Sequence, residues 1–221
     1  MTRINIAIDG YSGTGKSSTA KAVAKALSYT YIDSGAMYRA TTLYFIRQAI
    51  DIQNAASVSK ALAELKLTFE GSEICINSEN VESFIRSMEV NEKVSHVAAL
   101  RDVRVEMVRQ QQAMGKDKGV VMDGRDIGTV VFPDAELKVF MTANADVRAR
   151  RRMEELSQKG ISEELSVIKN NLLERDKIDS SREESPLIKA DDAIEVDTSD
   201  LTFDGQVSKI VKLAKAKINE N

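Results

Sequence analysis

One stretch near the start of the chain constrains the fold more than any other. Gly10–Ser17 reads Gly-Tyr-Ser-Gly-Thr-Gly-Lys-Ser and fits G-x-x-x-x-G-K-[ST] at every fixed position. Because so short a pattern also occurs by chance, the flanking sequence must decide its meaning. Ile4, Ile6 and Ile8 alternate before it as in a buried strand, and an Ala-rich segment of helical period follows it. The order strand, loop, helix predicts an α/β protein.

The chemistry of this stretch, called the phosphate loop below, suits an anion. Its glycines allow backbone angles closed to other residues, so successive N–H groups can converge on a phosphate at the helix N-terminus. Lys16 can reach β- and γ-phosphates, and the Ser17 hydroxyl can coordinate Mg²⁺. A glycine-rich turn that binds nothing is the alternative, and the full match with its flanking elements disfavours it.

Composition argues against several other classes of protein. The 221 residues suffice for one large domain, or for one domain with insertions. Since 31 Lys and Arg stand against 34 Asp and Glu, there is no global basic field, and we expect no nucleic-acid partner. One cysteine, Cys75, fits a reducing compartment. Without a leader or a long apolar run, we expect a cytoplasmic protein that does not bind membranes.

A second motif comes later in the chain. Gly119–Asp123 is a short apolar segment that ends in an acid, which is the Walker B arrangement. A carboxylate at the end of a buried parallel strand can lie beside the phosphate loop and hold a Mg²⁺-bound water. Arg125 and Asp126 follow at once, so we expect a cation and a second carboxylate at the same edge of the sheet.

The rest of the chain alternates between strand and helix patterns. Further strands are expected at 29–33, 65–69, 73–77, 137–142 and 193–197, and helices at 36–48, 55–65, 101–114, 162–175 and from about 207. The strands at 65–69 and 73–77 interrupt the alternation and predict an inserted subdomain. Val105, Val108 and Gln112 are expected on one face of their helix. Cys75 and His96 have no metal-ligand spacing around them and are interpreted as structural or surface residues.

Arginines recur in the later segments, and each group has two interpretations. Arg39 lies near a helix N-terminus, where a cation is unfavourable unless a phosphate is nearby; otherwise it is a surface residue. Arg175, Asp179 and Arg182 form a stripe if their helix continues, either as part of a site or as an ion-pair ladder.

The arginine-rich helix near residue 150 has the same ambiguity. Arg148, Arg151 and Arg152 share one helical face, where like charges repel. A bound polyphosphate would turn this repulsion into attraction. A solvated face compensated by Glu154 and Glu155 is the alternative.

Four motifs from end to end of the chain resemble bacterial-type cytidylate kinases. They are residues 8–17, 33–39, 123–135 and 174–187, and the third contains Gly-Arg-Asp-Ile-Gly-Thr-Val-Val-Phe-Pro-Asp-Ala. The resemblance implies a P-loop nucleoside monophosphate kinase fold, a parallel sheet flanked by helices, in a single domain 1–221. It also implies a small β-containing acceptor-binding insert at about 36–105 and a helical lid at about 145–178.

The resemblance further implies an ATP-dependent kinase of pyrimidine nucleotide metabolism, which moves the γ-phosphoryl of ATP to CMP or dCMP and gives ADP with CDP or dCDP. Mg²⁺ would enter as ATP·Mg, and the protein would be a monomer. Catalytic roles are implied for Lys16, Arg125, Arg148, Arg152 and Arg182. ATP binding is implied for Gly10, Tyr11, Ser12, Gly13, Thr14, Gly15, Lys16, Ser17, Ser18 and Arg151. Metal binding is implied for Ser17 and, through water, Asp123. Acceptor binding is implied for Ser34, Tyr38, Arg39, Ser95, Gln112, Arg125, Asp126, Arg175, Asp179 and Arg182.

One position departs from the family pattern. Many members have Gln-Arg where this chain has Gln111-Gln112. We expect Gln112 to keep a neutral hydrogen bond to the base, because an amide can both donate and accept but brings no charge.

Two rival functions stay open. A different small-molecule kinase on the same scaffold could act on UMP, AMP or a non-nucleotide. A GTPase-type switch is disfavoured because the sequence has no Asn-Lys-x-Asp motif, which such a switch uses to recognise guanine. Such a switch would also not need arginines to bind a second anion.

Overall fold

The computed structural model describes residues 2–158 and 160–220, which divide into two compact units. The first unit runs up to Tyr31 and resumes at Asp117, and the second is Ile32–Lys116. Residues 1, 159 and 221, which fall inside the expected domain and lid ranges, lie outside the described residues. The division into core, insert and lid stays a prediction.

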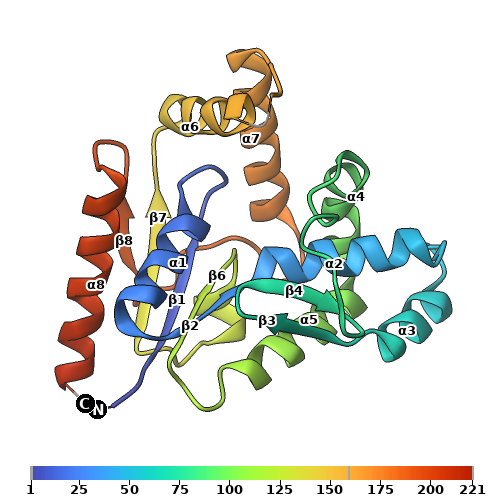
Figure 1. Ribbon diagram of the computed structural model, residues 1–221, viewed down its shortest axis with the longest axis horizontal. Coiled ribbons are helices and arrows are strands. Elements are labelled where there is room, and N and C mark those ends of the chain that lie inside the picture. Colours follow the sequence, from blue (N-terminus) through green and yellow to red (C-terminus); the bar gives the residue numbers. More distant parts are fainter. Residues whose placement is uncertain (1, 159, 221) are drawn as a thin grey trace. The chain divides into compact units, whose positions relative to one another are not determined.

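A parallel sheet organises the first unit. Within the described residues it has five strands in the order β2-β6-β1-β7-β8 (Figure 1). Their bounds are β1 Asn5–Gly10, β2 Thr30–Asp33, β6 Val120–Asp123, β7 Leu137–Thr142 and β8 Ile194–Asp197. β1 is parallel to both neighbours, and Ile8 is paired with Asp123. The carboxyl ends of these strands therefore meet at one edge, as the sequence predicts.

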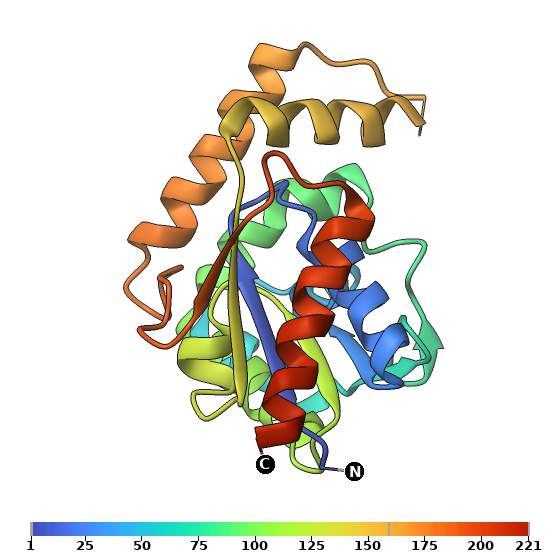
Figure 2. The same ribbon diagram turned by 90° about the vertical axis from the view of Figure 1, so that its left-hand side faces the viewer.

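Two helices cover the sheet next to β1. α1 spans Lys16–Leu27 and packs on α8, Phe203–Glu220, which runs along one face of the sheet (Figure 2). The core between them contains Ile6, Ile8, Val23, Val139 and Ile210, each with at most 1% of its surface exposed. The apolar alternation of the first strand and the helical spacing of α1 thus bury the same core.

Two further helices lie beyond the carboxyl edge, on the side of the phosphate loop (Figures 1 and 2). α6 spans Ala145–Gln158 and α7 spans Leu165–Ser181; they pack through Ala149, Ile168 and Leu172. The expected end of the second helix at residue 175 is wrong, because the helix continues to Ser181. After β6 the chain forms a short π-helix, η1, at Ile127–Val131.

The second unit combines helices with a small antiparallel sheet. Its elements are α2 Ser34–Arg47, α3 Ala55–Glu64, β3 Leu67–Glu70, β4 Glu73–Ile76, β5 Glu79–Asn80, α4 Met88–Ala99 and α5 Arg101–Met114. The β3–β4 hairpin confirms the two expected strands. β5 and α4 were not expected, since α4 buries only Val90 and Val97 among its described residues and so has a weak apolar period.

The buried face of α5 is not the face that carries Val105 and Gln112. Val103 and Met107 are fully buried, whereas 59% of the surface of Val105 is exposed. Gln111 is buried and Gln112 is exposed. Residues of similar polarity on both sides of this helix leave its buried face ambiguous in the sequence.

Candidate active site

The phosphate loop fits tightly against β7 and α6. Gly10 has φ of +140°, and a Cβ there would collide with the Met141 carbonyl. Gly13 has φ of +76°, and a Cβ there would lie 3.2 Å from the Arg148 Cβ. Both positions need glycine for conformation and for space. These two glycines thus set how closely the loop approaches its neighbours.

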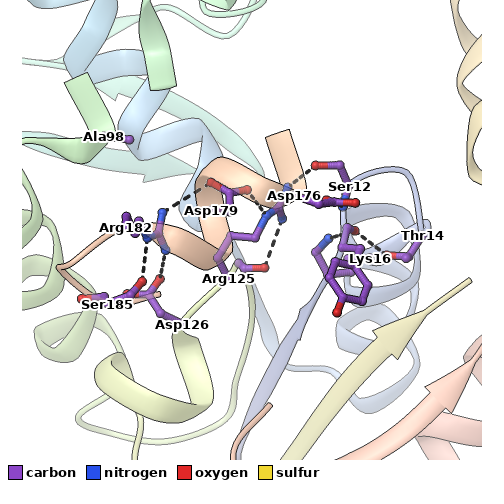
Figure 3. Close-up of polar contacts among 12 residues, drawn as sticks. Ser12, Thr14, Lys16, Ala98, Arg125, Asp126, Asp176, Asp179, Arg182 and Ser185 are labelled. Atoms are coloured by element: carbon purple, nitrogen blue, oxygen red, sulfur yellow. Dashed lines mark hydrogen bonds and ion pairs between the residues drawn. The ribbon is translucent and has the colours of Figure 1, made fainter. Parts of the chain in front are cut away.

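Lys16 and Thr14 close the loop on itself. The Lys16 ammonium donates to the Tyr11 carbonyl at 2.6 Å, and the Thr14 hydroxyl donates to the same oxygen at 2.9 Å (Figure 3). Burial lowers the pKa of Lys16 well below its usual value, and the charge of Arg125 lowers it further. A buried cation beside another cation is a favourable place for an anion.

Ser17 and Asp123 lie side by side, as the two motifs predict. The Ser17 hydroxyl donates to Asp123 Oδ2 at 2.8 Å, and the Tyr31 hydroxyl donates to Oδ1 at 2.9 Å. Only 3% of the surface of Asp123 is exposed. Asp123 therefore presents oriented carboxylate oxygens at the start of α1. Tyr31 is a contact that the sequence reasoning missed, although its place two residues before the end of β2 was a usable signal.

Asp9 fixes the segment after β6. Its carboxylate accepts from the N–H groups of Ile127 at 2.8 Å and Gly128 at 2.7 Å. Burial raises the pKa of Asp9 to about 6, against the lowering effect of these two hydrogen bonds, while Asp126 raises it and Lys16 lowers it. The sequence reasoning gave Asp9 no role, although an acid immediately before the loop was visible.

Arg125, Asp126, Asp179 and Arg182 form one polar network (Figure 3). Arg125 donates to Asp179 at 2.8 Å, and Arg182 lies 3.5 Å from Asp179 and 3.7 Å from Asp126. Since Asp179 bonds most closely to an arginine from another segment, a plain ladder within α7 does not describe it. Arg175 is exposed on α7. Of the five predicted residues in the Gly-Arg-Asp segment and the C-terminal motif, Arg125 and Arg182 thus share one carboxylate, that of Asp179.

Arg148 and Asp176 form an ion pair beside the phosphate loop, and Asp176 is labelled in Figure 3. Arg148 also donates to the carbonyls of Ser12 and Ala143, both at 3.0 Å, and its guanidinium lies over the Tyr11 ring. Asp176 accepts from the Ser12 N–H at 2.9 Å. Asp176 had no role in the sequence prediction, although it follows Arg175 in one of the quoted motifs.

Arg151 and Arg152 line a cavity of about 520 Å³ next to the loop. Arg151 donates to the Thr198 carbonyl at 2.6 Å and the Thr14 carbonyl at 3.4 Å. Arg152 forms an ion pair with Glu155 at 2.7 Å. This contact agrees with the alternative interpretation, in which glutamates compensate the arginines of this face. The other walls of the cavity are Gly13, Gly15, Ser18, Glu154, Glu155, Gln158, Leu201, Phe203 and Gln206. The sequence reasoning missed the wall from Leu201 to Gln206.

The remaining predicted residues belong to the second unit. Arg39 is half-buried and donates to Asn91 at 2.5 Å and to the Ile85 carbonyl at 3.4 Å. Tyr38 is buried beneath the Arg104 guanidinium. Ser34 is buried, Ser95 is half-buried and Gln112 is exposed. Within this unit the predicted residues lie on three helices, α2, α4 and α5.

The parallel sheet, the loop after its first strand and the Ser17–Asp123 pair define a protein of the P-loop nucleoside monophosphate kinase fold. A solved structure of an uncharacterised protein from Eubacterium ventriosum has a similar fold, with a TM-score of 0.54 at 15% identity over 97% of this chain and 99% of that one. No helix in the described part of the chain is long and apolar enough to cross a membrane.

Sequence comparison identifies the family within this class of proteins. The profile of the cytidylate kinase family matches residues 6–216. A cytidylate kinase of Cytophaga hutchinsonii is 50% identical over all of this chain and 97% of its own length. One of Flavobacterium johnsoniae is 50% identical over 96% of each chain. The chain belongs to the cytidylate kinase family.

Proposed function

We propose that this protein transfers the γ-phosphoryl group of ATP to CMP or dCMP, giving ADP with CDP or dCDP. The observation that carries the proposal is a complete phosphate loop, with Ser17 bonded to Asp123, in a chain that belongs to the cytidylate kinase family. The two named relatives, at 50% identity over nearly their whole lengths, support the same assignment.

ATP would bind at the phosphate loop and in the adjoining cavity. The loop amides and Lys16 would hold the β- and γ-phosphates, and Arg151, Arg152, Leu201 and Phe203 would face the rest of the nucleotide. Phosphate charge next to Lys16 would offset the burial that lowers the pKa of its ammonium, and would thus favour the charged form. Binding and charge stabilisation would reinforce each other there.

The residues beside the loop fit Mg²⁺. The Ser17 hydroxyl and the Asp123 carboxylate supply hard oxygen donors, which Mg²⁺ prefers. Mg²⁺ usually keeps several waters and is bound through one or two carboxylates together with substrate phosphates. When bound, Mg²⁺ would neutralise developing charge on the transferred group. Tyr31 would orient Asp123 for this role.

We assign the acceptor to the residues that the family motifs indicate. We assign its phosphate to Arg39 and Arg125, and its base and sugar to Ser34, Tyr38, Ser95, Gln112, Asp126, Arg175, Asp179 and Arg182. In the first unit Asp179 already orients Arg125, and Asp126 approaches Arg182. Preorganised cations of this kind lower the cost of gathering two anionic substrates.

No dedicated general base is needed for the transfer. The attacking phosphate oxygen of the acceptor is already anionic near neutral pH, so catalysis consists of positioning and cationic stabilisation. Lys16, Arg125, Arg148, Arg152 and Arg182 are the cations assigned to that role. We further propose a single kinase domain that works as a monomer in the cytoplasm.

An acceptor panel tests this proposal. ADP formation from ATP·Mg²⁺ is measured with CMP, dCMP, UMP, AMP or GMP, and without acceptor. We expect strong turnover with CMP and dCMP, weaker turnover with UMP, and little without acceptor. Preference for AMP, GMP or UMP over both cytidine nucleotides would refute the acceptor assignment. Equal ADP formation with and without acceptor would refute phosphoryl transfer altogether.

A further inference from the structure

One residue of the phosphate loop is held at each of its polar groups by a charged side chain. The Ser12 N–H donates to Asp176 at 2.9 Å, its carbonyl accepts from Arg148 at 3.0 Å, and its hydroxyl accepts from Arg125 at 2.8 Å. Ser12 has 3%, Arg148 5% and Asp176 7% of their surfaces exposed. These are buried, charge-assisted hydrogen bonds, which are stronger than neutral ones.

Ser12 needs such partners because of where it lies. It falls between the end of β1 at Gly10 and the start of α1 at Lys16, so neither the sheet nor the helix supplies partners for its backbone. Buried backbone groups without partners are costly. Asp176 and Arg148 meet both needs at once, and because they also pair with each other, they fix the orientation of this part of the loop.

The same pair joins the loop to α6 and α7. Arg148 lies in α6 and Asp176 in α7, and a Cβ on Gly13 would lie 3.2 Å from the Arg148 Cβ and 3.4 Å from Leu172. Both helices therefore abut the loop at the point where the pair holds it. A rearrangement at the base of α6 and α7 would change the shape of the loop, since packed interiors deform little.

We propose that Asp176 is a positioning residue, which together with Arg148 clamps Ser12 and holds the phosphate loop in the shape that binds nucleotide phosphates. This inference rests on the proposed nucleotide binding and goes beyond it, because it gives a binding role to an acid that itself repels phosphate. Asp176 acts through Ser12 and Arg148, and it needs no contact with substrate.

A second ion pair between the same helices provides a matched control. Lys169 of α7 donates to Asp146 of α6 at 2.7 Å, with 37% and 53% of these side chains exposed. This pair joins α6 to α7 without touching the phosphate loop. If the Asp176–Arg148 pair merely held the helices together, loss of either pair would change nucleotide binding to a similar degree.

The experiment measures ADP·Mg²⁺ affinity by titration calorimetry, with thermal unfolding of each variant. Asp176→Asn keeps an acceptor for the Ser12 N–H but removes the charge that orients Arg148. We expect its affinity for ADP to fall about ten-fold or more. We expect Asp146→Asn to stay within about two-fold of the unmutated protein. An Asp176→Asn variant that is folded at the assay temperature and binds ADP normally would overturn the proposal, even with a lowered Tm.

A second variant keeps the proposal testable if Asp176→Asn does not fold. Arg148→Lys retains a cation for Asp176, but it loses the Nε donor to the Ala143 carbonyl and the planar guanidinium that aims Nη1 at both Asp176 and the Ser12 carbonyl. We expect a several-fold loss of ADP affinity. Because ADP has no γ-phosphoryl group, this loss would not reflect a contact to the transferred group. Normal ADP binding by Arg148→Lys would refute the clamp.

The unmutated protein separates this inference from the proposed reaction. If it binds ADP·Mg²⁺ but does not phosphorylate cytidine nucleotides, the acceptor assignment fails, and the variants still decide the clamp by their ADP affinities. If it does not bind ADP·Mg²⁺ at all, both the proposed function and the clamp are overturned.

Discussion

The region around the phosphate loop and the helices of the second unit hold their predicted functional residues in different ways. In the first unit Lys16, Asp123, Asp126 and Arg148 are buried and are bonded to backbone, to hydroxyl groups or to opposite charge. In the second unit Ser34 and Tyr38 are also buried, but Arg39 and Ser95 are half-buried and Gln112 is exposed.

This difference indicates a division of labour. Groups that act on charge in a transition state gain from being fixed and dry before the reaction, because their reorganisation then costs little. Groups that recognise a substrate can order when it binds, at a cost in affinity. We therefore expect substitutions around the loop to lower kcat, and substitutions in the second unit to change the acceptor KM.

Lys16→Ala should have the largest effect. We expect kcat to fall by about 10³-fold, because a preorganised cation at the transferred group is lost. Thermal stability should be unchanged or higher, since burial disfavours the charged lysine, as its lowered pKa indicates. The measurements are steady-state kinetics and thermal unfolding. Lys25→Ala, on the exposed side of the same helix, is the control. Nearly normal kcat in Lys16→Ala would remove this residue from the mechanism.

The pH dependence of stability tests the burial of Asp9. Its pKa is about 6 in the folded protein, above the value near 4 expected on unfolding. The folded chain therefore binds more protons between these values. Asp9 contributes stability that is fully present below about pH 4 and is lost as pH rises through 6, by about 3 kcal/mol in total.

Urea unfolding from pH 4 to pH 8, of the unmutated protein and of Asp9→Asn, measures this contribution. We expect the stability of the unmutated protein relative to Asp9→Asn to fall across that range. Two parallel pH profiles would contradict the raised pKa of Asp9, and the contrast between a buried and a more exposed set of groups would weaken.

Arg39→Ala should separate the two regions most cleanly. We expect the KM for CMP to rise about ten- to hundred-fold, because a charge-assisted contact to its phosphate is lost. ADP affinity should not change. Kinetics with varied CMP and calorimetry with ADP check both parts. Arg47→Ala is the control. Arg47 lies on the same helix as Arg39, and the substitution breaks its exposed ion pair with Glu79. A loss of ADP affinity in Arg39→Ala would contradict the division of labour.

Gln112→Ala should have the smallest effect. We expect a change of a few-fold in the ratio of kcat/KM for CMP to that for UMP, since one neutral hydrogen bond to the base is lost. Gln110→Ala, whose side chain bonds to Glu106 on the same helix, serves as the control. Unchanged kinetics with both acceptors would exclude Gln112 from base recognition.

The fold followed from local patterns because its key elements are local. The alternation before Gly10 and the apolar run before Asp123 predict two adjacent parallel strands, and the structure pairs them. The Ser17–Asp123 contact could also be predicted, since both motifs end at the same sheet edge.

The clamp on Ser12 could not be predicted in this way. Asp176 lies 164 positions further along the chain, and no period or spacing links the two residues. The buried face of α5 could not be predicted for a different reason. Two adjacent glutamines give no signal of which one is buried. Local patterns therefore predict the elements that carry a site better than the tertiary contacts that shape it.

Direct detection of the transferred group tests the central claim. Phosphorus NMR follows ATP·Mg²⁺ incubated with the protein and CMP. We predict that the γ-phosphoryl signal of ATP declines as the β-phosphoryl signal of CDP grows in equal amount. Growth of inorganic phosphate in place of CDP, or no change in either signal, would contradict the assignment.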